Sequence, residues 1–158
     1  MTNKLALFDC DGTMVDSQAN ICASMDQAFE KHGLVPPDHH LVRRIVGLSL
    51  IEAVTQLLPE GDAAIVAAVT QSYKEGFFEL RQAGGVHEPL YDGLLQLLED
   101  LEASGWVLGV ATGKSDRGLH HVLETHGLGD RFITLQTADR HPSKPHPAMV
   151  ELAMAEAG

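Results

Sequence analysis

The sequence has 158 residues, of which 44% are hydrophobic and 21% are charged, and its formal net charge is −11. This composition is typical of a soluble globular protein. The length allows one domain, or one domain with a small insertion, and is sufficient to bury a hydrophobic core. The acidic balance argues against nucleic acid as a partner, because no basic stripe is present to neutralise phosphates.

The sequence pattern contains no targeting or membrane signal. The apolar run near the N-terminus is too short for a signal peptide, and no stretch approaches the length of a membrane span. The two cysteines, Cys10 and Cys22, form no C-x-x-C pair and suggest no disulfide framework. We therefore expect a cytoplasmic protein that does not bind membranes.

The first predicted element is a short, buried parallel strand, Lys4–Phe8, followed at once by an acidic segment. Asp9 and Asp11 therefore lie at the carboxyl end of a strand, where open α/β sheets bind ligands. Gly12 allows the sharp turn that follows. Because clustered carboxylates are costly unless a cation or a reaction needs them, we interpret this segment as a candidate site. An ordinary surface turn or a Ca²⁺ loop is the alternative.

Residues 16–84 are predicted to form an all-helical block. Apolar residues recur at helical spacing, and glycines and prolines separate the helices. The expected helices cover residues 17–32, 38–46, 50–58 and about 65–82, and a hinge or linker follows at Gly84-Gly85.

From Pro89 onward, short apolar strands alternate with helices. This alternation predicts a parallel sheet with helices on both faces, which the helical block interrupts after its first strand. The expected elements are a helix that ends near Gly105, a strand at 106–111, a helix at 115–126, a strand at 132–135 and a helix at 148–157.

Two further segments carry polar groups at places where an anion could bind. Thr112 and Gly113 follow the strand 106–111 and offer a hydroxyl group and an accessible amide. Ser115 as a helix N-cap is a sufficient structural explanation for this segment, and both interpretations can hold at once. Lys144 lies beside Pro145 in the loop before the last helix.

An acidic protein that binds anionic substrates needs local positive charge. The candidate cations are Lys114, Lys144, Arg43 and Arg44. The two arginines lie just before the segment Gly47-Leu48-Ser49, between two predicted helices, and could bind an anionic group of a ligand. A solvated arginine pair is the alternative.

Taken in order, these segments resemble motifs I, II and III of the haloacid dehalogenase-like hydrolase superfamily. Residues 8–17 resemble motif I, residues 111–115 motif II and residues 143–147 motif III, as found in its phosphoglycolate phosphatase and β-phosphoglucomutase branch. The resemblance implies a Rossmann-like α/β core, residues 1–15 and 85–158, and a helical cap, residues 16–84. It also identifies the segment around Gly47 as the substrate-specificity loop of that cap.

The resemblance implies a specific set of catalytic roles. Asp9 would be the nucleophile that forms an aspartyl-phosphate, and Asp11 the general acid and later the general base. Mg²⁺ would bind a carboxylate oxygen of Asp9 and the main-chain carbonyl of Asp11. Thr112, Gly113 and Lys144 would hold the transferring phosphoryl group. Because dehalogenases of the superfamily lack the second aspartate, Asp11 favours phosphate chemistry.

One expected motif has no counterpart in the sequence. Family members carry an acidic motif IV after a fourth strand, which completes the Mg²⁺ site, and nothing after Pro147 resembles it. We therefore expect this chain to stop before the metal site is complete and to bind Mg²⁺ poorly. We also expect it to be poorly stable alone, because its first strand would be exposed along one edge.

The resulting hypothesis is a Mg²⁺-dependent phosphatase that hydrolyses a small phosphorylated metabolite, such as phosphoglycolate or a sugar phosphate. The nearest alternative is a phosphosugar mutase, which uses the same aspartyl-phosphate but returns the group to the sugar. A non-catalytic fragment or interaction module is a second alternative, which the missing motif IV supports. The presence of Asp9, Asp11, Thr112 and Lys144 argues against it.

Overall fold

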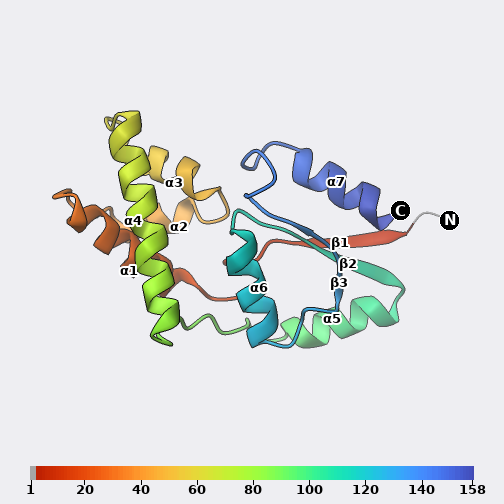
Figure 1. Ribbon diagram of the computed structural model, residues 1–158. Coiled ribbons are helices and arrows are strands. Elements are labelled where there is room, and N and C mark those ends of the chain that lie inside the picture. The colour runs from red at the N-terminus through yellow and green to blue at the C-terminus, as the bar shows by residue number, and fades with distance from the viewer. Residues whose placement is uncertain (1–2) are drawn as a thin grey trace. The chain divides into compact units, whose positions relative to one another are not determined.

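The computed structural model describes residues 3–158 and shows an α/β fold (Figure 1). The fold class predicted from the sequence is confirmed, and the strands 4–8 and 106–111 and the helix 148–157 have the predicted bounds. In chain order, the elements are β1 (Lys4–Phe8), α1 (Gln18–Lys31), α2 (His39–Arg44), α3 (Leu50–Leu57), α4 (Ala63–Gln82), α5 (Leu94–Ala103), β2 (Trp106–Ala111), α6 (Asp116–Thr125), β3 (Phe132–Gln136) and α7 (Ala148–Ala157).

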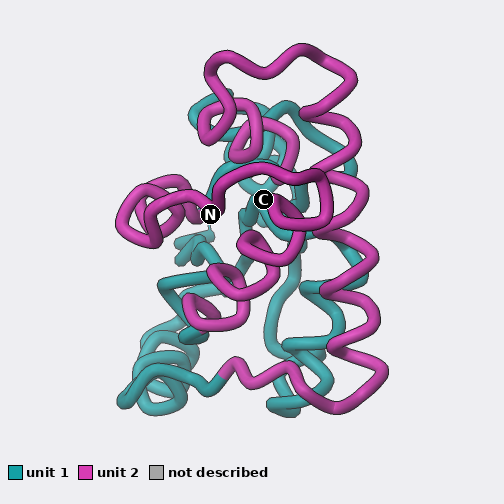
Figure 2. Tube along the Cα trace, turned by 90° about the vertical axis from the view of Figure 1, so that its left-hand side faces the viewer, with its two compact units in different colours: residues 1–16, 47–49, 89–158 teal, residues 17–46, 50–88 magenta. Residues whose placement is uncertain are grey.

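The chain forms two compact units, which Figure 2 shows in different colours. The first unit contains the chain up to Asp16, residues 47–49 and residues 89–158, and therefore the sheet with α5, α6 and α7. The second unit contains residues 17–46 and 50–88, which form the helices α1 to α4. Gly47–Ser49 thus groups with the sheet although it lies between two helices of the second unit. The assignment of core and cap domains remains a prediction.

Within the described residues, the strands form one parallel sheet in the order β1-β2-β3. Phe8 pairs with Val110, and Val110 pairs with Leu135. Because the three strands run in the same direction, their carboxyl ends lie at the same edge of the sheet, and the loops that follow them start there. This edge positions the candidate site.

Different helices cover the two faces of the sheet (Figure 1). α5 and α6 pack on one face, and α7 packs against the strands on the opposite face. The first face is built from Leu94 and Leu98 of α5, Leu119 and Val122 of α6, and Leu108 and Val110 of β2. On the α7 side the sheet has no room for a side chain at Gly109, whose Cβ would lie 2.6 Å from Thr134 Cγ2.

The strand β1 is less buried than its apolar sequence predicts. Residues 5–8 are half-buried and Lys4 is exposed. The reason is the position of β1 at an edge of the sheet, where only β2 pairs with it among the described residues. The expected exposed edge of this strand is thus present.

The helical unit has a hydrophobic core of its own. α1 and α4 contact each other, and Met25, Phe29, Val54 and Val69 are buried between the helices. Asp38 and Asp62 cap α2 and α4, because each side chain accepts a hydrogen bond from a main-chain N–H group of the first turn. None of the described helices is both long and apolar enough to span a membrane.

Candidate active site

The polar residues predicted from the sequence lie in the loops that follow the three strands. Asp9 and Asp11 follow β1, and Thr112 and Gly113 follow β2. Lys144 lies in the loop between β3 and α7. The ammonium group of Lys144 is 3.0 Å from Oδ2 of Asp9, so the structure brings together the first and third predicted segments.

The turn after β1 directs the two aspartates away from the core. The carbonyl group of Cys10 accepts hydrogen bonds from the main-chain N–H groups of Thr13, Met14 and Val15, and Gly12 has a positive φ of 78°. Cys10 is fully buried in the hydrophobic core beneath this turn. Asp9 and Asp11, on either side of Cys10, are only partly buried.

The Asp9 carboxylate has a defined orientation. Its Oδ1 accepts a hydrogen bond of 2.7 Å from the main-chain N–H group of Cys10, and its Oδ2 forms the ion pair with Lys144. The Asp9 side chain is 24% exposed, so it is accessible to a small ligand. A fixed, accessible carboxylate beside a cation is an arrangement suited to nucleophilic attack on an anionic phosphate group.

A second ion pair lies in the same unit. Nζ of Lys114 is 2.9 Å from Oδ1 of Asp11, and both side chains are only about a tenth exposed, 10% and 12%. The main-chain N–H group of Lys114 also donates a hydrogen bond to the hydroxyl oxygen of the fully buried Thr112. From the sequence, Lys114 was only one of four candidate cations. Its place directly after Thr112-Gly113 is the signal that could have singled it out.

The segment Gly47–Ser49 lies against the candidate site. A Cβ atom at Gly47 would be 3.1 Å from Asp9 Oδ2 and 3.7 Å from Lys144 Nζ, and Gly47 has a φ of 103°. The main-chain N–H group of Ser49 donates a hydrogen bond to the hydroxyl oxygen of Ser143, next to Lys144. These contacts place the predicted specificity loop beside the predicted nucleophile.

Gly113 is in close contact with this same segment. A Cβ atom at Gly113 would lie 2.2 Å from the carbonyl oxygen of Leu48 and 2.5 Å from that of Gly47. The structure therefore gives a packing reason for glycine at this position. The access of an oxyanion to the Gly113 amide, which the sequence suggested as the reason, remains a prediction.

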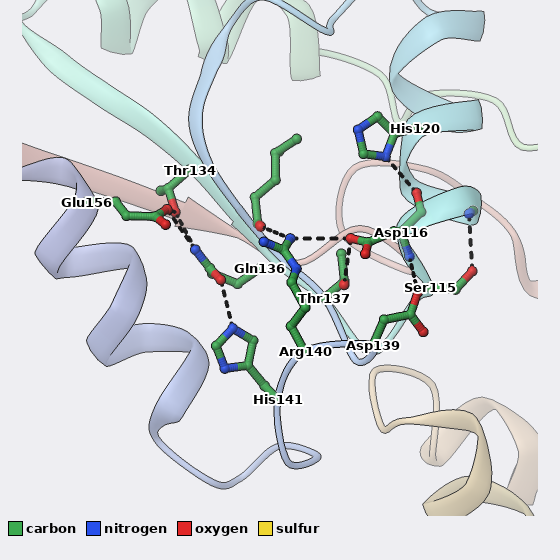
Figure 3. Close-up of polar contacts among 12 residues, drawn as sticks. Ser115, Asp116, His120, Thr134, Gln136, Thr137, Asp139, Arg140, His141 and Glu156 are labelled. Atoms are coloured by element: carbon green, nitrogen blue, oxygen red, sulfur yellow. Dashed lines mark hydrogen bonds and ion pairs between the residues drawn. The ribbon is translucent and has the colours of Figure 1, made fainter.

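Polar contacts fix one side of the loop between β3 and α7 to the start of α6 (Figure 3). Asp139 accepts a hydrogen bond from the main-chain N–H group of Asp116. The Asp116 carboxylate accepts hydrogen bonds from the Thr137 hydroxyl group and the Arg140 guanidinium group. Arg140 also donates to the carbonyl oxygen of Leu135 at the end of β3.

The other side of this loop is fixed to β3 and α7 (Figure 3). Nε2 of His141 lies 2.7 Å from Oε1 of the fully buried Gln136. The Gln136 amide donates to the Thr134 hydroxyl oxygen and to the Glu156 carboxylate of α7. These contacts hold residues 137–141, the first part of the loop that carries Lys144. No local sequence pattern singled these residues out.

The residues present supply oxygen ligands of the kind that Mg²⁺ prefers. The Asp9 carboxylate and the Asp11 main-chain carbonyl are hard donors from residues two apart in the chain. Across residues 3–158, no three or more His, Cys, Asp or Glu side chains are grouped so that they could hold a metal ion together. Two protein oxygens would leave most of the Mg²⁺ ligands to water or substrate oxygens, so the set fits Mg²⁺ but predicts weak binding.

The last predicted site residue, Arg43, belongs to the helical unit. It is exposed on α2, and its charge acts on the thiol group of Cys22 in α1. Burial raises the pKa of Cys22, and this effect is larger than the opposite effect of Arg43. The role of Arg43 towards a substrate remains a prediction.

Comparisons with known proteins agree with these motifs. A family model described as haloacid dehalogenase-like hydrolase matches residues 6–158. The chain is 36% identical to the protein named "Probable phosphatase IndB" of Dickeya dadantii, over 98% of this chain and 67% of that protein. It is 30% identical to an N-acetylmuramic acid 6-phosphate phosphatase of Pseudomonas aeruginosa, over 100% of this chain and 70% of the relative.

A further relative and a solved structure also resemble this chain. A phosphoglycolate phosphatase of Vibrio cholerae is 31% identical, over 91% of this chain and 66% of the relative. The crystal structure of a haloacid dehalogenase-like hydrolase from Bacteroides fragilis superposes with a TM-score of 0.86 at 24% identity, over 98% of this chain and 72% of that one. The structural similarity shows the fold alone. The sequence similarity links this chain to proteins that are named as phosphatases.

Proposed function

Because the chain belongs to the haloacid dehalogenase-like hydrolases and its relatives are phosphatases, we propose that it hydrolyses a small phosphate monoester with Asp9 as nucleophile. The observation that carries this proposal is the Asp9 carboxylate, oriented by the Cys10 N–H group and paired with Lys144 at the carboxyl edge of the sheet.

The reaction has two group-transfer steps. In the first, a carboxylate oxygen of Asp9 attacks the phosphorus atom, the ester P–O bond breaks, and the leaving oxygen takes a proton from the Asp11 carboxyl group. In the second, a water molecule attacks the phosphorus atom of the aspartyl-phosphate and gives its proton to Asp11. Inorganic phosphate leaves, and the Asp9 carboxylate is restored.

The phosphoryl group carries negative charge through both steps. Lys144 would neutralise part of this charge, and the Thr112 hydroxyl group and the Gly113 amide would bind the phosphoryl oxygens. The ion pair of Lys144 with Asp9 supports this role, because it places the ammonium group beside the nucleophile before a substrate binds.

We also propose Mg²⁺ as the cofactor, held by the Asp9 carboxylate and the Asp11 main-chain carbonyl. When bound, it would supply further neutralisation of the phosphoryl charge. The chain's free, buried cysteines are compatible with a reducing compartment, and we propose the cytoplasm.

The proposed substrate is a small phosphorylated metabolite. Two of the relatives reported above are named for N-acetylmuramic acid 6-phosphate and for phosphoglycolate, and each of these compounds is a phosphate ester that also carries an acid group. Arg43, four residues before Gly47 in the sequence, is the proposed residue for recognising such a second anionic group. No partner beyond this small substrate, and neither nucleic acid nor membrane, is proposed.

Release of inorganic phosphate tests the proposed function. The purified protein is incubated with p-nitrophenyl phosphate and with 2-phosphoglycolate, with Mg²⁺ and after removal of Mg²⁺ by a chelator. We expect Mg²⁺-dependent release that Asp9→Asn reduces by at least about a thousandfold, because removal of a nucleophile leaves only the residual catalysis of binding and charge stabilisation. Asp130→Asn, an exposed aspartate outside the site, is the matched control and should keep wild-type activity.

Other results would separate the alternatives. Transfer of phosphate between sugar positions without net release would support the mutase. Absence of both reactions on a panel of phosphorylated acids and sugars would support the non-catalytic alternative. Activity that Asp9→Asn leaves intact would contradict the assignment of Asp9.

A further inference from the structure

The ion pair between Lys114 and Asp11 is more buried than the other ion pair of the candidate site, and its lysine is also held by main-chain hydrogen bonds. The Lys114 and Asp11 side chains are 10% and 12% exposed, whereas Lys144 and Asp9 in the other pair are 30% and 24% exposed. Lys114 is also held at its main chain, since its N–H group bonds to Thr112 and its carbonyl oxygen accepts from the N–H group of Ala138. Both ends of this lysine are therefore constrained.

The aliphatic part of Lys114 lies over the first turn of α6. A Cβ atom at Gly118 would be 2.9 Å from Cγ of Lys114, closer than real Cβ atoms come without a shift, and a tight 3.1 Å from Cε. Gly118 lies inside the helix with a buried position, where alanine would favour helix formation more. The glycine thus provides the space that the Lys114 side chain occupies on its way to Asp11.

We propose that Lys114 is a positioning residue that holds the Asp11 carboxyl group in the orientation for proton transfer, and that Gly118 is the space that makes this possible. The inference rests on the proposed function, in which Asp11 protonates the leaving oxygen. An aspartate side chain has two rotatable bonds, and an ammonium group that donates to Oδ1 at 2.9 Å restricts both of them and leaves Oδ2 to carry the proton. Proton transfer depends on that restriction, because the acid must be within hydrogen-bonding reach of the leaving oxygen.

A direct contact between Lys114 and phosphate is the competing interpretation, and the leaving group distinguishes the two. A phosphate ligand acts on the group that all substrates share, so its loss would slow every substrate by a similar factor. A residue that acts through the proton donor matters most for esters with a poor leaving group. Alkyl phosphates need the proton, whereas p-nitrophenyl phosphate releases a stable anion without it.

The experiment compares kcat/KM for glycerol 2-phosphate and p-nitrophenyl phosphate in four proteins: wild type, Lys114→Met, Gly118→Ala and Gly76→Ala. The parameter kcat/KM covers the steps up to phosphoryl transfer to Asp9, so hydrolysis of the aspartyl-phosphate does not mask the effect. Gly76→Ala is the matched control. Gly76 also lies inside a helix, and a Cβ atom there would meet only Gln27 Oε1 at an ordinary 3.8 Å.

We expect Lys114→Met to lower kcat/KM for the alkyl ester at least tenfold more than for the aryl ester, since general acid catalysis typically contributes a hundredfold or more. Gly118→Ala should shift the ratio in the same direction and still unfold in a single cooperative transition, which separates the effect from misfolding. Gly76→Ala should leave the ratio unchanged.

Two results would overturn the proposal. Equal losses for both esters in Lys114→Met would mean that Lys114 acts on the shared phosphate or on the structure. An unchanged ratio in Gly118→Ala, with Lys114→Met folded and active on both esters, would remove the role of the glycine. A wild-type protein without phosphatase activity would instead refute the proposed function itself, and this inference with it.

Discussion

Each aspartate of the candidate site has a lysine within ion-pair distance: Lys144 beside Asp9 and Lys114 beside Asp11. The lysines come from different loops, so the four charges meet only when the carboxyl ends of β1, β2 and β3 are side by side. The motifs in the sequence identified both aspartates and Lys144. The pairing with Lys114 depends on contacts over about a hundred residues of chain, which no local pattern specifies.

Gly113→Ala tests the close contact between Gly113 and the segment Gly47–Ser49. An added methyl group would lie 2.2 Å from the Leu48 carbonyl oxygen, a main-chain atom, so the backbone would have to shift. We expect the free energy of unfolding to fall by about 1–3 kcal/mol, as for other overpacking substitutions, together with a loss of phosphatase activity. Urea unfolding and phosphate release are the measurements.

Gly129→Ala is the control for this substitution. Nothing lies within 4 Å of a Cβ atom at Gly129, and its φ is not positive, so stability should change by less than about 0.5 kcal/mol. If Gly113→Ala were as stable and active as the control, the segment Gly47–Ser49 would not pack on Gly113 in solution.

At the scale of elements, the sequence predicted that α6 has Ser115 as its N-cap, and the structure confirms this with a hydrogen bond from the Gly118 N–H group. The loop between β3 and α7 was also predicted, but its side-chain hydrogen bonds were not. The contacts of Gln136 and His141 were not predictable, because they join side chains whose directions are set by the sheet and by α7.

Gln136→Ala tests these contacts. Gln136 is fully buried and bonds to Thr134, His141 and Glu156, so its removal leaves buried polar groups without their partner. We expect a loss of about 2–3 kcal/mol in the free energy of unfolding, measured by urea denaturation. Gln96→Ala removes an exposed glutamine bonded to Asp100 and should cost less than about 0.5 kcal/mol. Equal losses in the two variants would contradict the structural role of the Gln136 contacts.

For the whole molecule, the order of elements followed from hydrophobic periodicity, because apolar strands and amphipathic helices differ in their repeat. The exposure of β1 did not follow from its own residues, since it depends on how many strands pair with it. The grouping of Gly47–Ser49 with the sheet could not be predicted from the sequence either, because its neighbours along the chain belong to the helical unit.

Cys22 provides a test of global folding. Its thiol is buried, and burial raises its pKa above the ordinary value of 9.0. The thiol is therefore more protonated in the folded chain than in the unfolded chain. The stabilising contribution is full below pH 9.0 and is lost as the pH rises through the folded-state pKa.

We expect Cys22 to be unreactive towards a thiol reagent at neutral pH until the protein unfolds. We also expect the free energy of unfolding to fall above about pH 9, by less in Cys22→Ala than in wild type. Reagent titration in buffer and in urea, and urea unfolding at several pH values, are the measurements. Rapid labelling of Cys22 in the native state would contradict its burial.

The glycine in the first turn of α6 also has a meaning for laboratory evolution. Helix propensity by itself favours alanine at position 118, because alanine is the better helix former and Gly118 has no positive φ. A Cβ atom there would displace the Lys114 side chain, so the alanine variant would gain helix propensity and, if Lys114 serves Asp11 as proposed, lose its turnover of alkyl esters. Only a screen that demands catalysis would keep the glycine.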